Sequence, residues 1–99
     1  SVGSVTPRQF AMQAAEGGLA EVRLSELARQ QAGSAEIRQL AERMIADHGK
    51  ANAEVQAIAR KKGMQLPQQL DAEHKATMQS LKAKQGAQFD AAYIAALKK

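Results

Sequence analysis

The chain has 99 residues and no cysteine, which bounds it to one domain with one core and excludes disulfide bonds and thiolate metal sites. It also lacks an apolar run near the roughly 18 residues that a transmembrane helix needs, so a membrane span is excluded. The 14 basic and 10 acidic residues leave a net charge of +4, but the basic residues are spread from Arg8 to Lys99. Such scatter favours a solvated surface over a nucleic-acid interface.

The composition favours helices throughout the chain. Alanine, leucine, glutamine, glutamate, lysine and arginine are strong helix formers, and they dominate the sequence. Aromatic residues, which are enriched in strands, number only three: Phe10, Phe89 and Tyr93. We therefore expect an all-α fold.

The first long helix is predicted to begin at Thr6-Pro7, because threonine is a good N-cap and proline suits the first helical position. Residues 1–6 then form an N-terminal tail, and residues 7–99 form a single helical domain. The helix is expected to end at Ala32-Gly33. Apolar or small residues recur along it at spacings of three and four, which predicts a buried stripe. That stripe comprises Phe10, Ala14, Gly17, Leu24 and Ala28.

A second long helix is predicted from the N-cap Ser34 to Gly63. Each long helix covers about 26–29 residues, or roughly 40 Å, and the short connection between them predicts antiparallel neighbours. The basic run 60–62 stands where a helix C-terminus favours positive charge. The apolar stripe of this helix comprises Ile37, Leu40, Ala41, Met44, Ala51, Val55, Ile58 and Ala59.

Two shorter helices are predicted to follow the linker Met64–Pro67. The first carries Leu70, Met78 and Leu81 and is expected to close at Gly86. The second covers the segment from Phe89 to Leu97. The expected architecture is thus a long antiparallel helix pair with two shorter helices, arranged as a four-helix bundle.

Polar residues interrupt these apolar stripes at positions where a core residue is expected. Glu21, His48 and His74 do so on three different helices, and Asp71 lies one turn before His74. Asp90 lies near the rim of the apolar face of the last helix. Buried carboxylates need partners, and inward carboxylates and imidazoles from several helices can hold divalent iron, zinc or manganese. These five residues are the candidate metal ligands.

Structural roles are the alternative for the same residues. An inward histidine is often hydrogen-bonded within or beside a core, and Glu21 can reach the surface or pair with an arginine such as Arg43. Asp47 and Glu73, each adjacent to a candidate histidine, extend the set of candidate ligands on the metal hypothesis.

Several runs of the chain resemble the bacterial domain of unknown function family 4142, a ferritin-like group whose members are often exported to the periplasm or the outer-membrane fraction. The most specific are Met44-x-x-Asp47-His48 and Phe89-Asp90-x-x-Tyr93. The full set of matching pieces comprises residues 10–22 and 40–48, Asn52, Leu66-Pro67, Glu73-His74 and residues 86–93.

This resemblance implies a ferritin-like bundle and a periplasmic or outer-membrane location, with the cytoplasm as the open alternative. Family members continue past Tyr93 into further helices, so the resemblance also implies that domain 7–99 is C-terminally shortened relative to the family. We expect a protein that acts by binding or protein contacts rather than by catalysis. The alternative is a ferritin-like metal-binding protein.

The short helices also predict a homodimer. They can cover the long pair only if they are laid end to end, because each is much shorter than roughly 40 Å. If the apolar stripes of the long helices stayed uncovered over half their length, they would form a larger apolar patch than monomers usually expose. A second copy related by a two-fold axis is expected to cover that patch.

Overall fold

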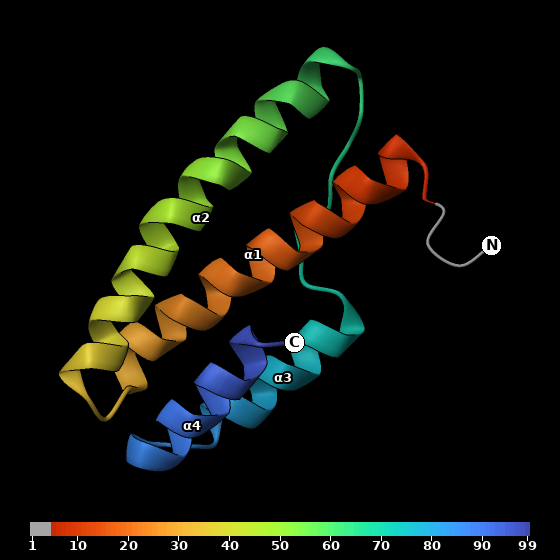
Figure 1. Ribbon diagram of the computed structural model, residues 1–99. Coiled ribbons are helices and arrows are strands. Elements are labelled where there is room, and N and C mark those ends of the chain that lie inside the picture. The colour runs from red at the N-terminus through yellow and green to blue at the C-terminus, as the bar shows by residue number, and fades with distance from the viewer. Residues whose placement is uncertain (1–4) are drawn as a thin grey trace.

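The computed structural model describes residues 5–99, and within them it is built from helices and the segments that connect them (Figure 1). The all-α prediction is confirmed. The described residues contain no helix with both the length and the apolar character needed to cross a membrane. The helices are α1 (Pro7–Gln31), α2 (Ala35–Lys61), α3 (Ala72–Lys82) and α4 (Gly86–Leu97).

Helix α1 begins where the sequence predicts. The Thr6 hydroxyl accepts a hydrogen bond from the Gln9 backbone N–H at 3.1 Å, and the Gln9 side chain accepts one from the Thr6 N–H at 2.9 Å. This reciprocal pair is a capping box, and Pro7 occupies the first turn, where its missing N–H costs nothing. The predicted end is also confirmed, since Ala32 is the C-cap.

A tight turn joins α1 to the antiparallel α2 (Figure 1). Ser34 caps α2 by accepting a hydrogen bond from the Ile37 N–H at 3.1 Å. Gly33 lies so close to the start of α4 that a Cβ placed on it would be 2.8 Å from the backbone of Gly86. Only glycine leaves room for this approach of two backbone segments.

Helix α3 is shorter than predicted at both ends. It begins after Asp71, because the Asp71 carboxylate caps it by accepting a hydrogen bond from the His74 N–H at 2.8 Å. Leu70 therefore lies in the connection before α3. Gly86, predicted to close this helix, instead has a φ of +60° and begins α4.

The main core forms where α3 and α4 pack against the C-terminal half of α1. Phe89 and Tyr93 of α4 are fully buried and stack with their ring centroids 6.0 Å apart. The Tyr93 hydroxyl shares a 2.5 Å hydrogen bond with the buried Ser25 hydroxyl of α1, so both polar groups are satisfied. The buried core residues are Leu24, Ala28, Ala32, Ala41, Leu81, Phe89 and Tyr93.

The opposite end of the long pair is only partly covered. A smaller cluster of Ala15, Ala59 and Leu66 forms there, with Leu66 supplied by the connection between α2 and α3. Phe10 and Ile58, both predicted on the buried stripes, are 65% and 55% exposed. The reason is that α3 and α4 lie beside each other rather than end to end, so they cover one half of the pair (Figure 1).

Candidate functional site

Two of the predicted site residues meet across the interface of the long helices. The Glu21 carboxylate on α1 lies 3.4 Å from Nε2 of His48 on α2, and the two side chains are 35% and 34% exposed. His48 thus lies against α1, as its place on the apolar stripe predicts. Glu21 thus contacts this histidine rather than Arg43.

A second acid–histidine pair lies within the first turn of α3. Nδ1 of His74 lies 2.9 Å from Oδ1 of Asp71, the same oxygen that accepts the His74 backbone N–H. That backbone hydrogen bond lowers the pKa of Asp71, and the charge and ring hydrogen bond of His74 lower it further, whereas desolvation opposes them. The pair therefore strengthens the start of α3.

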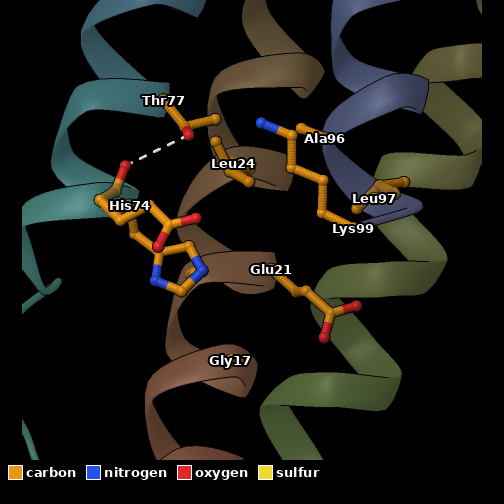
Figure 2. Close-up of a pocket in the computed structure, with 10 residues that line it drawn as sticks. Gly17, Glu21, Leu24, His74, Thr77, Ala96, Leu97 and Lys99 are labelled. Carbon is orange, nitrogen blue, oxygen red and sulfur yellow. Dashed lines mark hydrogen bonds between the residues drawn. The ribbon is translucent and has the colours of Figure 1, made fainter.

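The two pairs do not contact each other through a hydrogen bond or ion pair, although one residue of each lines the same pocket. Figure 2 shows His74 on α3 at one side of α1, while the Glu21 side chain extends on the other side towards α2. A pocket of about 220 Å³ lies between α1, α3 and the end of α4, and Glu21, Glu73 and His74 are among its lining residues. Within residues 5–99, no three or more histidine, aspartate or glutamate side chains gather closely enough to hold a metal ion.

Asp90 lies at the turn between α1 and α2, far along α1 from Glu21. Its Oδ1 accepts a hydrogen bond from the Gly33 N–H at 2.8 Å, and its Oδ2 accepts one from the Ser34 N–H at 3.1 Å. Both oxygens thus accept hydrogen bonds from backbone N–H groups at the start of α2. The positive end of the helix dipole also stabilises a negative charge there. This role differs from the predicted one, because a contact across more than fifty residues has no local signal in the sequence.

An apolar groove occupies the uncovered end of the long pair. It has a volume of about 270 Å³ and runs between the first turns of α1 and the last turns of α2. Apolar spacing predicts most of the residues that line it as core residues, and the short length of the later helices is the sequence signal that part of the long pair stays uncovered. The groove is lined by Pro7, Phe10, Ala11, Ala14, Val55, Ile58, Ala59, Lys62 and Met64.

Comparison with known families gives one match, which covers essentially the whole chain. Residues 2–99 match the family described as domain of unknown function DUF4142. No curated protein and no solved structure gave a significant match.

Proposed function

The chain belongs to the DUF4142 family, and we propose that it acts by binding another protein rather than by catalysis. The observation that carries this proposal is the apolar groove at the uncovered end of α1 and α2. Phe10 and Ile58 expose more than half of their surface beside it. Contiguous exposed apolar surface is typical of protein interaction sites, because burying it on binding gains hydrophobic free energy.

Site-specific photo-crosslinking in the native cells tests this proposal. Phe10 is replaced by a photoreactive phenylalanine, and Gln30, an exposed residue near the other end of α1, is replaced in a control variant. We expect a discrete protein adduct from position 10, its loss in an Ile58→Glu background, and no adduct from position 30. Equal labelling from both positions, or an adduct that survives Ile58→Glu, would contradict a binding role for the groove.

Metal binding is the second candidate function, and the short distance between Glu21 and His48 supports it. A carboxylate oxygen and an imidazole nitrogen 3.4 Å apart can share a divalent ion after small side-chain movements, with water completing its coordination. Iron, zinc and manganese are the candidates because all three accept this mixed donor set.

Elemental analysis of protein purified without chelators or affinity nickel tests the metal proposal. The wild-type chain is expected to carry a stoichiometric transition metal, which Glu21→Gln and His48→Gln both remove. His74→Gln serves as the matched control because its imidazole also pairs with a carboxylate, but with Asp71 of its own helix turn rather than with Glu21. A metal-free wild type, or equal loss of metal in all three variants, would refute a site at Glu21 and His48.

The location and the oligomeric state follow from the same reasoning and are proposals as well. We place the protein in the periplasm or the outer-membrane fraction, because its motifs resemble those of exported members of its family. Cell fractionation with compartment markers tests this location. A homodimer is the alternative way to cover the uncovered half of the long pair, and sedimentation over a range of concentrations distinguishes it from a monomer near 10.6 kDa.

A further inference from the structure

We infer that the apolar groove receives an amphipathic helix of a partner protein, and that the residues flanking the apolar face of that helix are acidic. This inference rests on the proposed binding function and adds the chemistry of the partner. It is drawn from the shape of the groove and from the charges beside it.

The groove has the dimensions of a short helical segment. On α1 it extends from Pro7 to Ala14, and on α2 from Val55 to Lys62, which is about 10 Å, or two helical turns, along each helix. Two turns of a partner helix present apolar side chains at positions i, i+3 or i+4, and i+7 on one face. A helix laid parallel to the seam can thus bury that face against Phe10, Ile58 and the alanines between them.

The charges beside the groove are mainly positive. Lys62 lines it, Lys61 precedes Lys62 at the end of α2, and Arg8 follows Pro7 at the start of α1. The first turn of α1 contains no acidic residue, while the negative dipole end of α2 lies beside it and Glu16 is the first acidic residue of α1. Glu54, one turn before Ile58, is the acidic residue nearest to the groove in the sequence of α2. This balance attracts acidic side chains at the flanks of a docked helix and repels basic ones.

The groove favours a protein helix over a lipid surface because it is concave. Phe10 of α1 and Ile58 of α2 line it from the two helices, together with smaller side chains such as Ala11, Ala14 and Ala59. A bilayer is approached by a convex apolar face, whereas a recess between two helices accepts a protruding ridge of side chains.

Two designed helical peptides of about eighteen residues test the inference with the full chain. Both carry leucine at i, i+3, i+4 and i+7, and their flanking positions are glutamate in one and lysine in the other. Fluorescence anisotropy measures binding at about 50 mM and about 500 mM salt, because salt screens charges outside the groove. We expect the acidic peptide to bind about five- to tenfold more tightly at low salt, with most of that advantage lost at high salt.

Variants separate the charge preference from the apolar contact. Lys61→Gln with Lys62→Gln is expected to remove most of the preference for the acidic peptide. Lys82→Gln with Lys98→Gln lowers the net charge equally at exposed positions away from the groove, and it is expected to leave the preference unchanged. Ile58→Glu and Phe10→Ser, which alter mostly exposed side chains, are expected to weaken both peptides without unfolding the chain.

Equal binding of both peptides, abolished by Ile58→Glu, would overturn the acidic preference and leave the binding function standing. Failure of both peptides, or binding that is indifferent to Ile58→Glu, would overturn the groove as a docking site. Two other occupants would also overturn the inference. A dimer in sedimentation that dissociates in Ile58→Glu would assign the groove to a second copy, and vesicles of anionic lipid that bind only the chain with Phe10 intact would assign it to a membrane.

Discussion

Replacing Asp90, the acidic residue of α4, by alanine should destabilise the fold more than replacing any acidic residue of α2 by alanine. The substitution removes two hydrogen bonds that a carboxylate accepts from the Gly33 and Ser34 backbone N–H groups. Hydrogen bonds to a charged group contribute about 1.5–3 kcal/mol each, and water can partly replace them at this exposed turn, so we expect a total loss of about 2–3 kcal/mol. For a domain of this size that corresponds to a Tm lower by about 10–20 °C.

Chemical denaturation and thermal melting by circular dichroism measure this loss. Asp90→Asn keeps one acceptor oxygen and should lose about half as much. Asp47→Ala removes an exposed carboxylate of α2 and serves as the control. If the free energies of unfolding of the Asp90→Ala and Asp47→Ala variants differ by less than about 0.5 kcal/mol, the two hydrogen bonds contribute little to stability and the prediction is wrong. The Asp90→Ala variant also distinguishes the turn-binding role of Asp90 from its predicted role as a metal ligand. Loss of a metal ligand would lower the metal content, whereas loss of the turn contacts would lower the stability of the metal-free protein.

Other parts of the fold give further predictions. Tyr93→Phe should cost about 1–2 kcal/mol in denaturation experiments because it leaves the buried Ser25 hydroxyl unpaired, and adding Ser25→Ala should recover part of the loss. Burial raises the pKa of Tyr93, with the Ser25 hydrogen bond opposing this, so stability should be complete below about pH 10 and fall above it. Tyrosinate absorbance reports this ionisation, and a normal titration curve in the folded chain would contradict it. Gly33→Ala should destabilise the α1–α2 turn by clashing with the Gly86 backbone, and a melting temperature equal to that of the wild type would show that the turn can shift. The lowered pKa of Asp71 implies stability that is present above about pH 4 and lost as the pH falls through that lowered value, and Asp71→Asn should flatten this acid dependence.

Local sequence signals predicted the helices that carry strong caps. Thr6-Pro7 and Ser34 mark the starts of α1 and α2, and the structure confirms both caps. A cap is a contact between residues three or four positions apart, so the residues near a helix start are enough to predict it. The start of α3 differs from the prediction because Asp71 caps this helix, a role to which the same local rule applies.

The candidate site was predicted only in part. Glu21 and His48 meet because both stand on facing stripes of an antiparallel pair, a relation that spacing and loop length make predictable. Asp90 belongs to a different place, since its carboxylate binds the backbone of a turn more than fifty residues earlier. Spacing along one helix carries no information on such a contact.

Composition, caps and periodicity therefore determined the class of fold, the antiparallel long pair and the inward position of His48. The tertiary structure alone decided which half of that pair is covered. Apolar stripes run the full length of α1 and α2, but burial depends on where α3 and α4 dock, and Gly33 and Asp90 hold the start of α4 at the α1–α2 turn. The apolar spacing predicts Phe10 and Ile58 as core residues. They line an open groove instead, because the short helices pack at the other end of the long pair.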